Sequence, residues 1–206
     1  MCGIVGITSS KEVTSRIIGS LKKLEYRGYD SAGIATITEN NINEVKCEGR
    51  VNELEKNINQ INLSGTIGIG HVRWATHGKP STINAHPHSS DNVSVVHNGI
   101  IENSTILKKI LEKKGYRFKS QTDTEVIVHL VTDYLKKNNL KDTIIKVLKK
   151  LHGSFALGII FKDQPDLIVG ARRGSPLAVG YGPDEHYLGS DSYALKSMTN
   201  KISYLN

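Results

Sequence analysis

The residue with the clearest chemical potential is the cysteine at the second position, Cys2. Methionine before a small residue is a substrate for aminopeptidases, so trimming of Met1 would leave Cys2 with a free α-amine. An α-amine has a reference pKa of about 7.7 to 8.0 and can accept a proton near neutral pH. One terminal residue would then supply both a thiol nucleophile and its base. The alternative is that Cys2 is a small buried hydrophobic residue.

Asn98 and Gly99 follow the apolar stretch VSVV. An Asn-Gly pair commonly forms a tight turn. An Asn side-chain amide and a following Gly backbone N–H can also donate to one oxygen atom, as an oxyanion hole requires. The dipeptide alone leaves both interpretations open.

Arg73 and Asp123 have the charges needed to hold the two ends of an amino acid. A guanidinium can bind an α-carboxylate through two hydrogen bonds. A carboxylate near the start of a helix can bind an α-ammonium. The alternatives are a surface salt bridge for Arg73 and a helix cap or first-turn residue for Asp123.

Several histidines invite a metal hypothesis, namely His71, His77, His86, His88 and His97. Their spacings match neither HExxH nor CxxC-type sites, and no carboxylate cluster accompanies them. The chain also lacks the phosphate-binding pattern GxxxxGK[ST]. We therefore expect no metal and no cofactor.

The formal net charge is +7, which could indicate a nucleic-acid partner. The lysines, however, occur in pairs within helical patterns, as expected for solvated helix faces. Aromatic residues that could stack on bases are few, and no nucleic-acid motif is present. We interpret the charge as a contribution to solubility and expect no nucleic acid to bind.

The two cysteines, Cys2 and Cys47, are too few and too far apart for a disulfide framework, which favours a reducing compartment. The N-terminus lacks the basic leader and cleavage site of a signal peptide. No stretch approaches the roughly 20 apolar residues that span a bilayer. We expect a cytoplasmic protein without a membrane partner.

Helical periodicity predicts helices over 11–25, 103–114, 122–134 and 141–152. In the second helix the expected apolar stripe is Ile106, Leu107, Ile110 and Leu111. Thr122 and Glu125 have the spacing of a capping box at the start of the third helix. In the fourth helix Ile144, Ile145, Leu148 and Leu151 are expected to face inward.

Strands are predicted over 3–8, 33–38, 66–72, 93–97, 155–161 and 167–171. Several are apolar on both faces, as expected for strands between two layers. The order of strands, then helices, then strands lacks strict βαβ alternation and favours an α+β fold. No linker interrupts the chain, so one domain over residues 1–206 is expected.

The chemical motifs are distinctive in combination. MCGIVGI, LEYRGYDSAG, HVRWATHG, NAHPH, VVHNGIIEN and TDTEV, in this order and spacing, resemble the class II glutamine amidotransferases, which are N-terminal-nucleophile hydrolases. The resemblance extends from Met1 to the SDSYAL segment at 190–195. It implies a four-layer αββα sandwich, in agreement with the apolar strands and flanking helices.

The resemblance implies a glutamine-hydrolysing enzyme whose nucleophile is Cys2 and whose base is the freed α-amine of that residue. Asn98 and Gly99 match the oxyanion-hole donors. The implied chemistry is acyl transfer: a thioester forms, ammonia leaves, and water releases glutamate. If Met1 is retained, the amine does not belong to Cys2 and activity should be impaired.

The substrate-binding residues are also implied by the matching motifs. Arg73 matches the residue that binds the carboxylate of L-glutamine, with Thr76 and His77 contributing from the same loop. Asp123 matches the partner of the α-ammonium, and Trp74 matches a mobile aromatic residue that covers the site and controls the exit of ammonia.

Arg27 and His86 are similar to residues that support the Cys2 end of the site.

Within the family, RWATHG favours members joined to a sugar-phosphate isomerase half with two SIS subdomains, which form homo-oligomers. Amidophosphoribosyltransferase, which tends to carry tyrosine and serine in that motif, and glutamate synthase are the alternatives. The isomerase half is absent here, and the chain is expected to stop at SYLN before its domain is complete. Outside the enzyme class, a non-catalytic regulatory module that kept the fold is the alternative.

Overall fold

The computed structural model describes residues 2–75 and 78–205, which form two antiparallel sheets flanked by helices. The helices are α1 (Thr14–Leu24), α2 (Val51–Ile61), α3 (Ser104–Lys113), α4 (Glu125–Leu135), α5 (Leu140–Lys150) and α6 (Ser192–Leu195), with short 3-10 turns at Glu25–Arg27 and Thr82–Asn84. The strands are β1 (Gly3–Thr8), β2 (Ser31–Thr38), β3 (Asn41–Glu48), β4 (Ile67–Arg73), β5 (His88–Ser89), β6 (Val93–Ile101), β7 (Gly153–Phe161), β8 (Gln164–Arg173), β9 (Ala178–Gly182), β10 (Glu185–Gly189) and β11 (Ile202–Tyr204).

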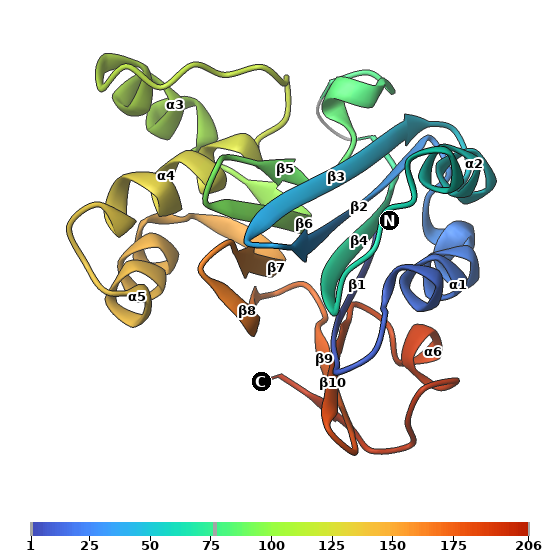
Figure 1. Ribbon diagram of the computed structural model, residues 1–206. Helices are drawn as coiled ribbons and strands as arrows, with labels where there is room; N and C mark the ends of the chain where they lie inside the picture. Colours follow the sequence, from blue (N-terminus) through green and yellow to red (C-terminus); the bar gives the residue numbers. More distant parts are fainter. Residues whose placement is uncertain (1, 76–77, 206) are drawn as a thin grey trace.

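The larger sheet has the strand order β11-β9-β10-β1-β4-β2-β3, and the smaller sheet has the order β5-β6-β7-β8. Figure 1 shows α1, α2 and α6 on the outer side of the larger sheet and α3, α4 and α5 on the outer side of the smaller one. The layers therefore run helix, sheet, sheet, helix. The expected αββα sandwich is confirmed.

Three apolar clusters hold the layers together. The first packs α1 and α2 against the larger sheet, with Ile17 and Leu21 among its buried residues. The second packs α3, α4 and α5 against the smaller sheet. The third fills the space between the sheets and includes Ile4, Ile69 and Val96.

The alternation of side chains along each strand decides which residues enter the space between the sheets. On β4, Ile67 and Ile69 belong to the central cluster, whereas Val72 belongs to the cluster beneath the helices. His71 and Arg73 have the same parity as Ile69, so they point between the sheets. The same argument places Cys2, the residue before β1, with Ile4, and Asn98 of β6 with Val96.

The predicted helices and strands are all present, with ends shifted by a few residues. The predictions missed α2, α6 and five strands. Helix α2 buries Val51, Leu54 and Ile58, but its polar sequence VNELEKNINQI hides this narrow stripe. Strand β3 lies at the edge of its sheet and is largely exposed, so it lacks the apolar run used to find the inner strands.

Three helix predictions were wrong in detail. The capping box does not form: the Glu125 carboxylate accepts hydrogen bonds from the backbone N–H groups of Lys119 and Ser120 at 2.8 and 2.7 Å. Ile106, Ile110 and Ile145 are exposed rather than inward, since the stripes of α3 and α5 that reach the sheet are narrower than predicted.

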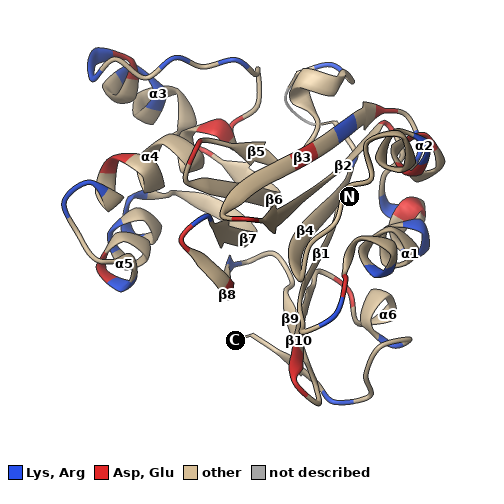
Figure 2. Ribbon diagram, in the orientation of Figure 1, with Lys and Arg blue, Asp and Glu red and all other residues tan. Residues whose placement is uncertain are grey.

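The charged side chains lie mainly outside the sheets. Figure 2 shows the Lys and Arg segments spread over the outer helices and loops, while the inner strands carry few of them. No helix in the described part of the chain is long and apolar enough to cross a membrane.

Candidate active site

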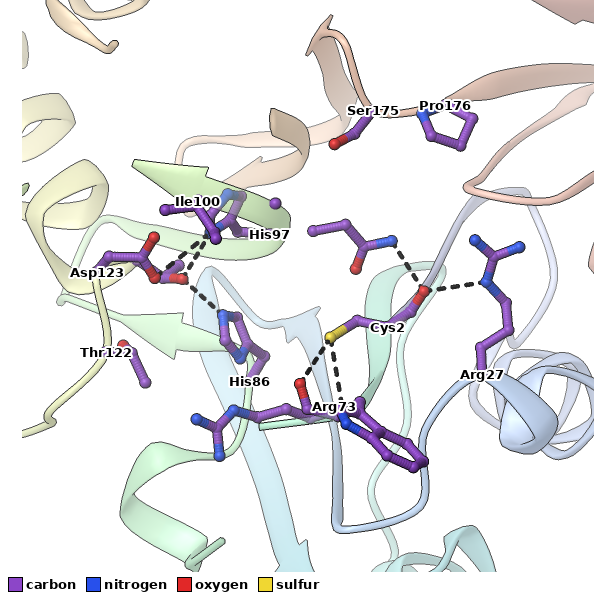
Figure 3. Close-up of a pocket in the computed structure, with 14 residues that line it drawn as sticks. Cys2, Arg27, Arg73, His86, His97, Ile100, Thr122, Asp123, Ser175 and Pro176 are labelled. Carbon is purple, nitrogen blue, oxygen red and sulfur yellow. Dashed lines mark hydrogen bonds and ion pairs between the residues drawn. The ribbon is translucent and has the colours of Figure 1, made fainter. Parts of the chain in front are cut away.

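A pocket of about 250 Å³ is lined by residues from both sheets, and Cys2 lies in it (Figure 3). Arg73, Asn98, Gly99 and Asp123 also line the pocket. The structure therefore brings together the thiol, both oxyanion-hole candidates and both charged candidates, which lie far apart in the sequence.

The Cys2 residue is held at both its side chain and its backbone. Its Sγ accepts a hydrogen bond from the Trp74 N–H at 3.3 Å and lies 3.5 Å from the Trp74 carbonyl oxygen. Its carbonyl oxygen accepts from Asn98 Nδ2 at 3.1 Å and from Arg27 Nε at 3.2 Å. Burial raises the pKa of the thiol and outweighs the opposing effects of the Trp74 N–H and the Arg73 charge. Cys2 is thus a thiol that needs a base to become a nucleophile.

Asn98 and Gly99 do not form a turn, so the tight-turn interpretation is wrong. Both lie within β6, which continues to Ile101. Gly99 has a φ of +120°, and a Cβ atom there would lie 2.1 Å from the carbonyl oxygen of Ser154 on β7. Only glycine fits this position without moving β7.

Arg73 is buried, with 3% of its surface exposed. Its Nη2 donates to the Gly78 carbonyl oxygen at 3.1 Å, and its Nη1 lies 3.8 Å from Asp30 Oδ1. Asp30 also accepts a hydrogen bond from the Ala75 N–H. Asp30 was not among the residues predicted from the sequence, although it belongs to the LEYRGYDSAG motif.

The approach of the Glu25–Arg27 turn to this segment depends on Gly28. A Cβ at Gly28 would lie 2.6 Å from the carbonyl carbon of Arg73. Arg27 reaches from the turn to the Cys2 carbonyl, and its Nη1 donates to Asp191 Oδ2 at 2.8 Å. Asp191, in the SDSYAL segment, was not predicted from the sequence either.

Asp123 is 8% exposed and precedes α4 rather than belonging to it. Its Oδ2 accepts from the Ile101 N–H at 2.7 Å, and its Oδ1 lies 4.0 Å from His97 Nδ1. In Figure 3 the Asp123 carboxylate and the Arg73 guanidinium lie on one side of the pocket, and the Cys2 sulfur faces them from the other. This arrangement suits an amino acid whose reactive group is at the end of its side chain.

A cluster of buried histidines lies beside the pocket, and its member His86 lines the pocket itself. The rings of His71 and His86 stack with centroids 4.4 Å apart, and His88 meets His86 edge-on at 4.7 Å. Burial lowers the pKa values of His71 and His88 to about 3, and it lowers that of His86 as well. Within the described residues, no group of three or more His, Cys, Asp or Glu side chains is arranged to hold a metal ion.

Thr124 connects His86 of this cluster to another buried histidine, His97. Its Oγ1 lies 2.7 Å from His86 Nε2 and 2.9 Å from His97 Nδ1. His86 therefore contacts Thr124 and the His71 ring, and its role as a direct support of Cys2 stays a prediction.

The remaining candidates lie at the rim or outside the described residues. Trp74 is 48% exposed, and its ring meets Tyr29 edge-on with centroids 5.5 Å apart. Thr76 and His77 lie outside the described residues, as does Met1.

Known proteins with a similar sequence cover the whole chain. Residues 72–197 match the family described as "Glutamine amidotransferase domain". The chain is 53% identical to the glutamine--fructose-6-phosphate aminotransferase [isomerizing] of Bradyrhizobium diazoefficiens, over 100% of this chain and 34% of that relative. The protein of the same name from Mesorhizobium japonicum is 55% identical, with the same coverage. The chain thus spans about a third of the length of these relatives.

Solved structures agree with this result. The glutamine phosphoribosylpyrophosphate amidotransferase of B. subtilis, complexed with ADP and GMP, has a TM-score of 0.82 and 30% identity over 99% of this chain and 44% of that one. The fold and the similar solved structures place the chain in the class of the N-terminal-nucleophile hydrolases. Within that class, the chain belongs to the glutamine amidotransferase family.

Proposed function

We propose that this chain hydrolyses L-glutamine to glutamate and ammonia through a thioester on Cys2. The observation that carries the proposal is the position of Cys2 Sγ in one pocket with Asn98, Gly99, Arg73 and Asp123. Removal of Met1 gives Cys2 the α-amine that serves as its base. The raised thiol pKa makes this base necessary near neutral pH.

The reaction has two acyl-transfer stages. The α-amine takes the thiol proton, and Sγ attacks the carboxamide carbon of glutamine, whose oxygen becomes an oxyanion. The Asn98 Nδ2 and Gly99 N–H groups donate to that oxyanion. The intermediate collapses when the C–N bond breaks and the leaving nitrogen takes the proton from the amine. Water then attacks the thioester, releases glutamate and restores the thiol.

The charged side chains hold the substrate's other end. Arg73 binds the α-carboxylate, together with Thr76 and His77, and Asp123 binds the α-ammonium. Trp74 covers the bound substrate. The exclusion of water protects the thioester and directs the ammonia to an acceptor.

The acceptor is inferred from the relatives, of which this chain covers 34%. We propose that residues 1–206 act as one domain of a longer cytoplasmic, homo-oligomeric protein. Its C-terminal half binds fructose 6-phosphate and uses the ammonia to make glucosamine 6-phosphate.

The test combines the intact mass of the protein expressed in cells with ammonia release from L-glutamine. We expect loss of the initiator methionine, formation of glutamate, and no turnover by Cys2→Ala. Cys47→Ala is the matched control, because Cys47 is the other cysteine and lies in the core beneath the helices. Turnover by Cys2→Ala, or turnover by protein that retains Met1, would overturn the proposal.

A further inference from the structure

The Asn98 amide contacts a residue outside the pocket. Asn98 lies on β6 of the smaller sheet, and its Oδ1 is 3.0 Å from Nε2 of His71 on β4 of the larger sheet. The same His71 Nε2 is 3.0 Å from the backbone carbonyl oxygen of His97. His71 is fully buried, and no part of the proposed reaction uses it.

The carbonyl contact decides which ring nitrogen of His71 carries the hydrogen. A backbone carbonyl oxygen can only accept a hydrogen bond, so Nε2 must be protonated. An Nε2–H group facing Asn98 requires an acceptor there, which is the amide oxygen. The Nδ2 group of Asn98 then points the other way, and it donates to the Cys2 carbonyl at 3.1 Å.

The surroundings of the other ring nitrogen of His71, Nδ1, favour the neutral imidazole with its hydrogen on Nε2. Among the described residues, Nδ1 is buried and has no hydrogen-bond partner. The His71 ring stacks on that of His86 with centroids 4.4 Å apart, so a second proton would place a charge against another buried ring. Burial therefore lowers the pKa of His71 to about 3, although its hydrogen bonds with Asn98 and His97 partly oppose this. The imidazole is neutral, with its single hydrogen on Nε2.

We infer that His71 is a positioning residue for catalysis: its Nε2–H holds the Asn98 amide with Nδ2 toward Cys2 and so keeps the oxyanion-hole donor in place. This inference rests on the proposed function of Cys2 and Asn98. Without the His71 donor, the amide can turn over and present Oδ1 to the developing oxyanion. A carbonyl-type oxygen there would repel the negative charge instead of stabilising it.

The decisive experiment is a double-mutant cycle in steady-state glutamine hydrolysis. We expect His71→Leu to lower kcat about 10- to 100-fold with little change in KM, since it acts on the transition state. In an Asn98→Ala background the same substitution should change kcat by less than about threefold, because the amide it orients is gone. Equal losses of kcat in both backgrounds would overturn the inference.

A matched control separates orientation of Asn98 from a loosened histidine cluster. His88 is buried in the same cluster, and its Nε2 contacts Thr122 Oγ1 at 3.0 Å rather than Asn98. The factor by which His88→Leu changes kcat should be the same in the unsubstituted chain and in the Asn98→Ala background. If the effects of His88→Leu and Asn98→Ala on kcat are as non-additive as those of His71→Leu and Asn98→Ala, general loosening of the cluster explains both results. The inference would then be wrong.

One measurement needs no variant that could misfold. Nitrogen-15 NMR of the imidazole of His71 in the unsubstituted protein should show a protonated Nε2 and an unprotonated Nδ1 from about pH 5 to 8. A protonated Nδ1 with a bare Nε2 would overturn the inference. Failure of the Cys2→Ala test would instead overturn the proposed function, so the two failures can be told apart.

Discussion

The side-chain amide of Asn98 lies 3.1 Å from the carbonyl oxygen of Cys2, so a strand of the smaller sheet is tied directly to the residue that precedes β1 of the larger one. The amide is therefore beside the thiol before any substrate arrives. Donors that are already in place when charge develops lower a barrier more than donors that must reorganise.

This contact predicts the behaviour of Asn98→Ala. Asn98 is the proposed oxyanion-hole donor, and its loss should lower kcat for glutamine hydrolysis by about 10²- to 10³-fold. KM should change little, because the donor acts on the developing charge rather than on bound glutamine. Steady-state measurement of ammonia release provides both constants.

Alkylation of Cys2 by iodoacetamide is the control for Asn98→Ala. That reaction creates no oxyanion, so the variant should be alkylated within about threefold of the normal rate, well short of the loss expected in kcat. If alkylation slows as much as hydrolysis, Asn98 acts by holding Cys2 and not by stabilising the oxyanion.

Replacement of Gly99 should reduce the stability of the fold, rather than act on the chemical step alone. Its φ is +120°, and a Cβ would lie 2.1 Å from the Ser154 carbonyl oxygen. We expect Gly99→Ala to lower the free energy of unfolding by about 2 to 4 kcal/mol, from backbone strain and displacement of β7. Gly115→Ala is the matched control: its φ is +90°, but nothing lies within 4 Å of the added atom. That control should cost only about 1 kcal/mol in urea unfolding. Equal costs would show that the close contact with Ser154 is unimportant.

Much of this architecture could be predicted from apolar patterning. Strands such as β1 and β4 are buried on both faces, and their sequences GIVGIT and IGIGHVR indicate this directly. Edge strand β3 pairs with one strand only, and helix α2 buries only a narrow stripe, so neither has the broad apolar pattern used to find the other elements.

The meeting of Cys2, Asn98 and Arg73 in one pocket could be predicted from the joint order of the motifs, but the contacts that support these residues could not. Asp30 and Asp191 act through partners far away in sequence, namely Ala75 and Arg27. His71 looked like one member of a histidine series, and only the approach of β4 to β6 reveals its contact with Asn98. Long-range pairing of this kind leaves no local signal in a single sequence.

Replacement of Asp123 should weaken recognition of one group of the substrate, the α-ammonium of glutamine. In Asp123→Asn the charge is lost, while an amide oxygen can still accept from the Ile101 N–H that Asp123 Oδ2 contacts at 2.7 Å. We expect kcat/KM for L-glutamine to fall about 10- to 100-fold, the value of a charge-assisted hydrogen bond. For 4-carbamoylbutanoate, which is glutamine without its α-amine, kcat/KM should change less than about threefold.

The contrast between the two substrates is the control for a distorted pocket. An equal loss for both would mean that Asp123 shapes the pocket and does not bind the ammonium. Asp133→Asn, on the surface of α4 where the carboxylate pairs with Lys114, should leave both values unchanged.

The buried histidines predict how stability depends on pH. His71 and His88 have pKa values of about 3 in the folded chain against a reference of 6.5. Between these values the unfolded chain binds more protons, so the free energy of unfolding falls as the pH falls from 6.5. Each such histidine adds a slope of up to about 1.4 kcal/mol per pH unit. Above the reference value they contribute no slope.

Replacing one histidine shows how much of the pH dependence of the free energy of unfolding that histidine causes. The carboxyl of Glu125 is buried, which raises its pKa, but hydrogen bonds from His129, Lys119 and Ser120 outweigh this and lower the pKa to about 2. The contribution of Glu125 to the free energy of unfolding is lost only as the pH falls below the reference pKa of 4.5. The effect of the histidines on the free energy of unfolding is therefore measured between pH 4.5 and 6.5. Urea unfolding of His88→Gln across this interval should give a slope smaller by about 1.4 kcal/mol per pH unit than that of the unsubstituted chain. Parallel curves would mean that His88 already binds its proton in the folded chain, and the interpretation of the histidine cluster as neutral would be wrong.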